Sequence, residues 1–98
     1  MPKLIFHPDI KKEIKESYQW YESKTNGLGE DFMVELESAF QMIKEMPNTW
    51  PVISMNFRRY LLKRFPYGVI YQIKQDDIYI AAVMHLSRAP GYWLKRME

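Results

Sequence analysis

Four residues in the second half of the chain have side chains that could together cleave an RNA phosphodiester bond. His85, Arg88 and Tyr92 follow the last predicted strand, and Arg64 lies near the end of an earlier one. Because antiparallel neighbours place the end of one strand beside the start of the next, we expect these groups to converge at one rim of a sheet. In RNA cleavage a base removes the 2′-OH proton, an acid protonates the leaving 5′-oxygen, and an arginine stabilises the charge on phosphorus. No metal ion is required.

Each group has a catalytic interpretation and a structural one. His85 could act as a general acid or base because its unperturbed pKa lies near neutrality. Tyr92 could act as an acid or as a platform on which a nucleobase stacks, and Arg88 or Arg64 could bind the phosphate. Structurally, a histidine at a strand end often hydrogen-bonds a loop carbonyl, and Arg64 can pair with a helix carboxylate or lie along an aromatic ring. The pair Tyr92-Trp93 can also act as a hydrophobic lid. Arg88 has the strongest functional case, since it lies in a predicted exposed turn.

The composition argues against several other classes of site. The chain has no cysteine, which excludes disulfides, thiolate nucleophiles and cysteine-bound metals. His7 and His85 are far apart in the sequence, so we expect no metal site and no cofactor. Gly27 and Gly29 follow a predicted helix rather than a strand, which does not fit a phosphate-binding loop. A Ser–His–Asp triad has no local signature here.

Charge is distributed unevenly along the chain. Residues 1–56 hold six Lys or Arg and nine Asp or Glu, whereas residues 57–98 hold eight basic and three acidic residues. The basic half coincides with the predicted sheet. This asymmetry favours an anionic partner such as RNA, DNA or an acidic peptide, although basic residues are also common on solvated strands.

Two amphipathic helices are predicted in the first half of the chain. The first helix is expected to begin with Pro8 at its first position and Asp9 at the positive end of the helix dipole. It is expected to end at Gly27 in a left-handed conformation, and the second helix at Pro47. The apolar stripes recur at helical spacing, so we expect an antiparallel hairpin. Their members are Ile10, Ile14, Ser17, Tyr18 and Tyr21, then Phe32, Leu36, Ala39, Phe40 and Ile43. The charged residues expected to point largely to water are Lys11, Lys12, Glu13, Lys15, Glu16 and Glu22.

The second half predicts a three-stranded antiparallel meander. Its strands are Phe57–Phe65, Val69–Lys74 and Ile78–Met84, joined by short loops. Lys3–Phe6 is a short strand that we expect to pair with the meander, and Val52–Asn56 is an irregular approach to it. The expected fold is α+β, one domain over residues 1–98, with the helices covering one face of the sheet. We expect the functional surface on what the helices leave open.

The two ends of the chain carry weaker signals. The N-terminal MPKLIFHPD has too short an apolar run for a signal peptide, and no window reaches the length of a membrane span. A cytoplasmic location is therefore expected. Gly91–Met97 forms either a brief helix or a tail that orders on a partner.

The order of these elements resembles the ParE/RelE superfamily of toxins from bacterial toxin–antitoxin modules, and its ParE-like branch in particular. The resemblance covers nearly the whole chain and implies a strand, a helical hairpin and a three-stranded meander. The residues that carry it are Gly27-Leu28-Gly29, Phe32, Leu36 and Pro47, then Arg59-Tyr60-Leu61-Leu62-Lys63-Arg64-Phe65-Pro66-Tyr67, Val69-Ile70-Tyr71 and His85-x-x-Arg88-x-Pro90-x-Tyr92-Trp93.

The superfamily divides by target. RelE-like members resemble ribosome-dependent mRNA endonucleases (mRNA interferases), whereas ParE-like members poison DNA gyrase and need no nuclease centre. Nuclease members usually have basic residues at alternate positions of the first meander strand and an arginine near the start of the second. Here Arg59 and Lys63 keep part of that row, Leu61 interrupts it, and Gly68 occupies the approximate position of the arginine. Arg88 matches the arginine after the last strand.

The resemblance implies the toxin of a type II toxin–antitoxin system (a plasmid stabilisation protein), ParE-like and acting on gyrase as a gyrase inhibitor. One alternative is an mRNA interferase that uses His85, Arg88 and Tyr92 without a metal; another is a non-toxic remnant that only binds a partner. Whether the chain is an enzyme stays open. One expected partner is a cognate antitoxin that covers basic residues of Arg58–Arg64. The other is the target, either gyrase or the ribosome with mRNA. We expect no membrane and no small-molecule cofactor as partners. Expected target- or nucleic-acid-binding residues are Arg59, Lys63, Arg64, Arg88 and Trp93.

Overall fold

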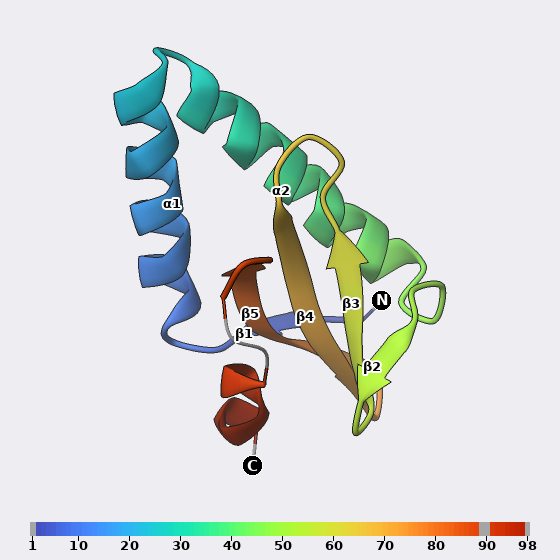
Figure 1. The fold of residues 1–98 in the computed structure, drawn as a ribbon. Helices are drawn as coiled ribbons and strands as arrows, with labels where there is room; N and C mark the ends of the chain where they lie inside the picture. The colour runs from blue at the N-terminus through green and yellow to red at the C-terminus, as the bar shows by residue number, and fades with distance from the viewer. Residues whose placement is uncertain (1, 89–90, 98) are drawn as a thin grey trace.

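A five-stranded sheet with a pair of helices on one face forms the computed structural model, which describes residues 2–88 and 91–97 (Figure 1). In chain order the elements are β1 (Leu4–Phe6), α1 (Ile10–Lys24), α2 (Leu28–Glu45), β2 (Val52–Ser54), β3 (Phe57–Leu61), β4 (Tyr67–Lys74), β5 (Asp77–His85) and the 3₁₀ helix η1 (Tyr92–Met97). The expected α+β class and helical hairpin are confirmed. None of the helices in the described part of the chain is long and apolar enough to cross a membrane.

The strands lie in the order β1-β5-β4-β3-β2. The meander β3-β4-β5 is antiparallel, as predicted, and β1 pairs with β5 in parallel. The prediction was wrong at Val52–Asn56, because Val52–Ser54 forms β2, an antiparallel edge strand on β3. The strand is only three residues long and Val52 is exposed, so the segment shows no alternation by which a sequence pattern identifies a strand.

Strand β3 is also shorter than predicted, since it ends at Leu61 rather than at Phe65. The chain then bends, with Leu62 and Phe65 buried on the helix side, and β4 begins at Tyr67. The bend is held by the Glu35 carboxylate of α2, which accepts hydrogen bonds from the backbone N–H of Lys63 and, at 3.2 Å, of Arg64.

The helix ends differ from the sequence prediction in detail. Asp9 is the N-cap of α1, so Pro8 precedes the cap instead of occupying the first helical position. Gly27 is left-handed as predicted, with φ +88°, but it is the N-cap of α2 rather than the end of α1. Gly27 begins α2 because the Glu22 carboxylate caps that helix: it accepts hydrogen bonds from the backbone N–H of Gly27 at 3.1 Å and of Gly29 at 2.8 Å. An anion at the positive end of α2 stabilises that terminus.

The main core lies between the helices and the sheet. The predicted stripe of α2 is buried there, with Phe32 and Leu36 at 0% exposure, against Val69, Tyr71 and Ile80 of the sheet. An aromatic group closes the upper end of this core, with ring centroids 4.9 to 6.1 Å apart. It consists of Tyr21, Phe32, Phe65 and Tyr67. Each such side chain contributes about 1.5–3 kcal/mol by burial, so this face carries most of the fold's stability.

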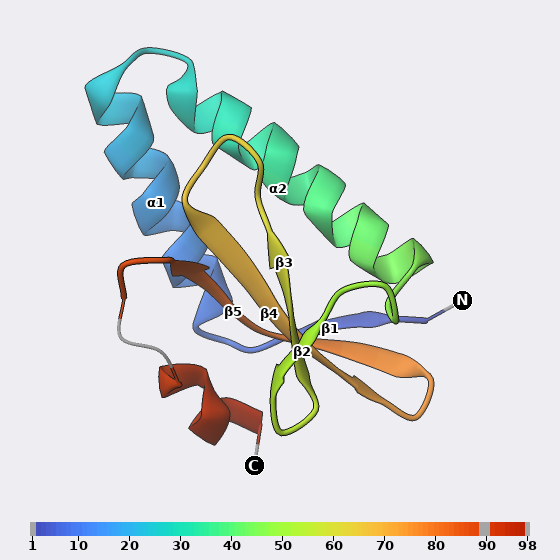
Figure 2. The ribbon, with the colours of Figure 1, turned by 45° about the vertical axis from the view of Figure 1, so that its right-hand side comes forward.

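Among the described residues, those of η1 pack on the opposite face of the sheet. Figures 1 and 2 place η1 on the side of the sheet away from α2. There Trp93 packs on Phe57, with ring centroids 4.8 Å apart, in a smaller cluster with Ile70, Ala82 and Met84. Of the two expectations for Gly91–Met97, the brief helix is the one that the structure adopts.

Candidate functional site

Glu13 of α1 is the centre of a charged cluster beneath the end of β5. One of its oxygens accepts a hydrogen bond from the Arg96 guanidinium at 2.7 Å and from the Tyr92 hydroxyl at 3.3 Å, and lies 3.7 Å from Arg88. The other oxygen accepts from the backbone N–H of Val83 at 3.3 Å. The carboxylate therefore joins α1, β5 and the C-terminal segment.

Tyr92 is held by two arginines as well as by Glu13. The Arg88 guanidinium lies 3.6 Å from the centroid of the tyrosine ring and that of Arg96 4.8 Å, both within cation–π range. The two differ in access to solvent, because the Arg96 side chain is 13% exposed and the Arg88 side chain 52% exposed. Arg96 also donates to the carbonyl of Ala81 at 3.0 Å. Arg96 is therefore a structural cation, whereas Arg88 presents its charge outward.

The environment of Tyr92 does not suit proton transfer. Burial, and then the charge of Glu13, raises the pKa of Tyr92 to about 12, while Arg88 and Arg96 act in the opposite direction. The hydroxyl is therefore neutral at physiological pH and donates its proton to Glu13. An efficient general acid or base has a pKa near the working pH, and Tyr92 does not.

His85 is placed at the rim but is engaged by its own loop. The backbone N–H of Ser87 donates to His85 Nδ1 at 3.0 Å, and the Ser87 hydroxyl lies 2.7 Å from the same nitrogen. Because Nδ1 accepts from the Ser87 N–H, the neutral ring carries its proton on Nε2, and Nδ1 is turned toward its own loop. The ring faces Tyr67 edge-on at 5.1 Å, away from the stack on Tyr92.

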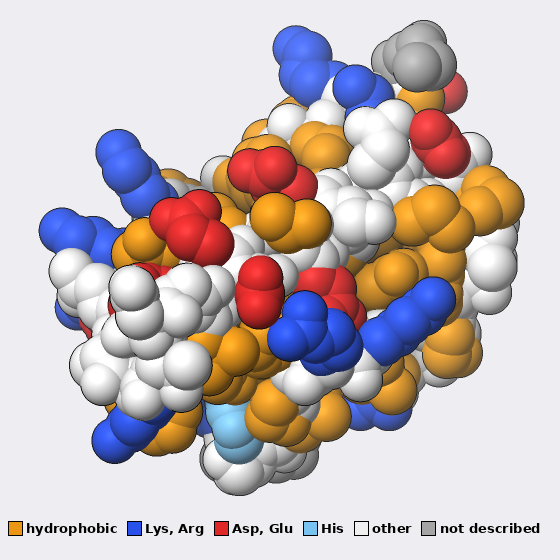
Figure 3. All heavy atoms as spheres, turned by 90° about the horizontal axis from the view of Figure 1, so that it is seen from above, with side chains coloured by type: hydrophobic (Ala, Val, Ile, Leu, Met, Phe, Trp, Pro, Cys, Tyr) orange, Lys and Arg blue, Asp and Glu red, His pale blue; other side chains and the backbone are white. Residues whose placement is uncertain are grey.

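Arg64 does not join this cluster. Its guanidinium pairs with Asp31 of α2 at 3.4 Å and lies 5.5 Å from the centroid of Phe65, which matches both structural interpretations drawn from the sequence. Figure 3, the view from above, shows acidic and basic side chains next to one another with hydrophobic ones between them. The structure thus brings Arg88 and Tyr92 together, and places Arg64 elsewhere.

The expected binding residues fall into two environments. Lys63 and Arg64 are exposed at the bend after β3, while Arg59 lies on the open face of the sheet. Gly68 makes room for Arg59, since a Cβ there would lie 3.2 Å from the arginine Cγ. Trp93 is 3% exposed, so its indole has no open face and its burial does not fit the expected role in target binding.

Sequence reasoning missed Glu13 and Arg96. Glu13 was assigned to the water-facing side of α1, and the structure corrects this, since the Glu13 side chain is 12% exposed. The signal was present, because position 13 lies three residues after Ile10 and four before Ser17, on the same helical face as the apolar stripe. Arg96 had no such signal in a six-residue 3₁₀ segment.

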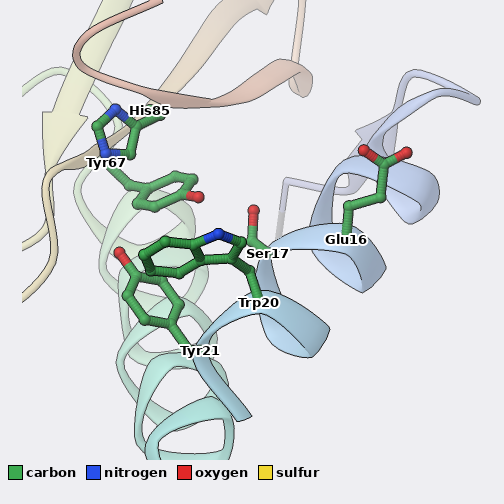
Figure 4. A pocket seen from close by; sticks show the side chains of 6 residues that line it. All are labelled: Glu16, Ser17, Trp20, Tyr21, Tyr67 and His85. Carbon is green, nitrogen blue, oxygen red and sulfur yellow. The ribbon is translucent and has the colours of Figure 1, made fainter. Parts of the chain in front are cut away.

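Two pockets adjoin this cluster. The first, of about 300 Å³, lies between α1 and the neighbouring ends of β4 and β5 (Figure 4). Its lining residues are Glu16, Ser17, Trp20, Tyr21, Tyr67 and His85. The second, of about 280 Å³, is lined by Asp9, Lys12, Glu13, Glu16, Arg88 and Arg96. Within residues 2–88 and 91–97, no group of three or more His, Asp or Glu is arranged to hold a metal ion.

Comparisons with known proteins agree with the fold. Residues 4–90 match the family model described as the ParE toxin of type II toxin–antitoxin system, parDE. The chain is also similar to a solved structure of the chromosomal ParDE TA system from P. aeruginosa, with a TM-score of 0.65 at 16% identity, covering 88% of this chain and 97% of that chain. At that identity the likeness concerns the fold. No curated protein matches by sequence. The resemblance inferred from the sequence motifs is confirmed by the family match.

Proposed function

Because the chain belongs to the family of ParE toxins of type II toxin–antitoxin systems, we propose that it acts on DNA gyrase and pairs with a cognate antitoxin. The gyrase target follows from the ParE-like branch that the sequence resembles. The antitoxin follows from the two-component system that the family description names. A gyrase target would also place the protein in the cytoplasm.

The single observation that supports gyrase over RNA as the target is that the candidate catalytic side chains are hydrogen-bonded within the protein. Tyr92 has a pKa near 12 and donates to Glu13, and the acceptor nitrogen of His85 is used by Ser87. Arg88 is a cation held against the Tyr92 ring, and hydrogen bonds within the protein engage the Tyr92 hydroxyl and His85 Nδ1. Such a cation can bind an anionic or acidic surface, but it cannot by itself transfer the protons that phosphodiester cleavage requires.

The test compares two activities of one preparation. Supercoiling of relaxed plasmid by purified gyrase and ATP should fall as the protein is added, while mRNA in a purified translation system should stay intact. Arg88→Ala should weaken the inhibition, and Lys15→Ala, which removes an exposed cation of α1 outside both pockets, should leave it unchanged.

Two results would contradict this proposal. Cleavage of mRNA at the ribosomal A site that Arg88→Ala abolishes, with gyrase unaffected, would replace it with the endonuclease function, for which the exposed guanidinium of Arg88 is the favourable observation. Inertness toward both targets, in a folded protein that still binds its antitoxin, would identify a non-toxic remnant.

A further inference from the structure

Two neighbouring pockets lie beside α1, and we propose that together they form one groove that binds a segment of the antitoxin presenting one large apolar side chain and, close to it, a carboxylate. The apolar side chain occupies the pocket beside Trp20, and the carboxylate pairs with Arg88. This proposal rests on the antitoxin partnership proposed above and is independent of the gyrase target.

The first pocket suits an apolar side chain. Trp20 is 58% exposed and packs edge-on against Tyr21, with centroids 5.4 Å apart, while Tyr21 and Tyr67 are 9% and 8% exposed. Figure 4 shows these three rings gathered together, with the Glu16 carboxylate directed away from them. An exposed tryptophan over a hollow of buried aromatic rings is typical of an interface anchor point, because its contact area becomes favourable once water is excluded.

The second pocket supplies the charge. Glu13 is already bound by Arg96 at 2.7 Å and by the Tyr92 hydroxyl, so its 3.7 Å contact with Arg88 is the weakest of the three. The Tyr92 ring holds the Arg88 guanidinium in place. Arg88 is therefore a positioned, half-exposed cation that can form a charge-assisted hydrogen bond to an incoming carboxylate without losing a strong partner.

The two pockets have one lining residue in common. Glu16 lines both, and the chain after β5 runs from one to the other, with His85 in the first and Arg88, three residues later, in the second. One short segment of a partner can therefore fill both. A polyanion such as DNA fits less well, because the second pocket holds three carboxylates for its three cations.

The groove also connects antitoxin binding to neutralisation. Arg88 is the cation that we propose for target binding, so a segment seated in the groove would cover it. The antitoxin and the target would then compete for the same guanidinium.

Binding is measured by calorimetry between the full-length chain and the purified product of a small reading frame adjacent to its gene, the candidate antitoxin. Trp20→Ala and Arg88→Glu should each raise the Kd at least about tenfold, as expected for anchor residues, and Trp20→Phe and Arg88→Lys should recover part of the loss. Val34→Ala is the matched apolar control, since Val34 is 67% exposed on α2, and Lys15→Glu is the matched charge reversal. Both controls should bind like the unchanged chain.

Circular dichroism establishes that each variant is folded. Equal affinity of Trp20→Ala, Arg88→Glu and the two controls would overturn the groove while leaving the partnership intact. Absence of a complex with the unchanged chain would overturn the partnership and the groove together. Gyrase activity plays no part in the measurement, so failure of the gyrase proposal alone leaves this result standing.

Discussion

The face of the sheet that α1 and α2 cover is filled with large apolar side chains, whereas the opposite face holds a smaller cluster closed by η1. On the covered face, side chains such as Phe32 and Leu36 are excluded from water entirely. On the open face, the C-terminal segment is attached by one indole, Trp93, and by the polar contacts of Glu13. The hydrophobic effect stabilises both faces, through a larger cluster on the first and a smaller one on the second, where the polar contacts of Glu13 add to it.

Hydrogen bonding is also less complete on the open face. Among the described residues, the buried side-chain polar atoms without a hydrogen-bond partner are Arg59 Nε, Gln72 Oε1 and Trp93 Nε1. Trp93 and Arg59 share this face with Phe57, and Gln72 is the cross-strand partner of Phe57. An unsatisfied buried polar group costs about 1–3 kcal/mol. The helix-covered face therefore holds the larger and better-satisfied core, and the face covered by η1 the smaller and less satisfied one.

The largest expected effect is on the covered face. Leu36→Ala should lower the free energy of unfolding by about 3–4 kcal/mol, because Leu36 is fully buried and its truncation leaves a cavity. Urea denaturation followed by circular dichroism measures this. A loss below that of Glu13→Ala would reverse the assignment of stability to this face.

Glu13→Ala should cost less, about 2 kcal/mol, because it removes the acceptor of three donors and leaves Arg96 largely buried without its carboxylate. Hydrogen exchange should accelerate first in η1 and near Val83, with α2 unaffected. Glu16→Ala is the matched control, since Glu16 is exposed and forms only a solvent-exposed pair with Lys12. Uniform acceleration throughout the chain would mean that the two faces unfold as one unit.

Alkaline titration probes one tyrosine on each face. Burial raises the pKa of both Tyr71 and Tyr92 from 10.0 to about 12, so the unfolded chain loses these protons first. Stability should therefore be fully present below pH 10 and fall as the pH rises toward 12. The pKa of Tyr18 is raised by its hydrogen bond to Glu30 and that of Tyr21 by burial, so absorbance at 295 nm should show several late-titrating phenols. Tyr71→Phe and Tyr92→Phe should each remove one of those that titrate near pH 12. Complete ionisation of all tyrosines near pH 10 in the folded protein would contradict this.

The smallest effect is expected at the bend after β3. Arg64→Ala should change the free energy of unfolding by no more than about 0.5 kcal/mol, since Arg64 and Asp31 are 63% and 52% exposed and water screens the pair. Thermal unfolding at low and at high salt tests this. A larger loss that salt abolishes would show that this exposed pair contributes to the covered face.

Much of the fold was predictable because it repeats a local pattern. The stripe Phe32, Leu36, Ala39, Ile43 has the period of a helix, and all four residues are buried. Short loops joined β3, β4 and β5 as antiparallel neighbours. Strand β2 has three residues and no such repeat. It forms by pairing with the edge of β3, which is a tertiary contact and not a local pattern.

The candidate site was less predictable because its contacts join residues far apart in the chain. Arg88 and Tyr92 were expected at one rim, and they do meet there, but both also contact Glu13 of α1, about 75 residues earlier in the chain. Arg64 was expected there too, yet Asp31 of α2 holds it elsewhere. No local period distinguishes these outcomes.

The sequence by itself determined the helices, the meander, the absence of cysteine chemistry and the likeness to ParE toxins, because periodicity, composition and motif order are properties of neighbouring residues. Only the tertiary structure decided that Tyr92 is a half-buried hydrogen-bond donor, that His85 Nδ1 accepts from the Ser87 N–H and that Arg88 stands half-exposed beside an aromatic hollow. Protonation and access depend on what surrounds a side chain in space. Those surroundings come from packing between segments that the chain order keeps apart.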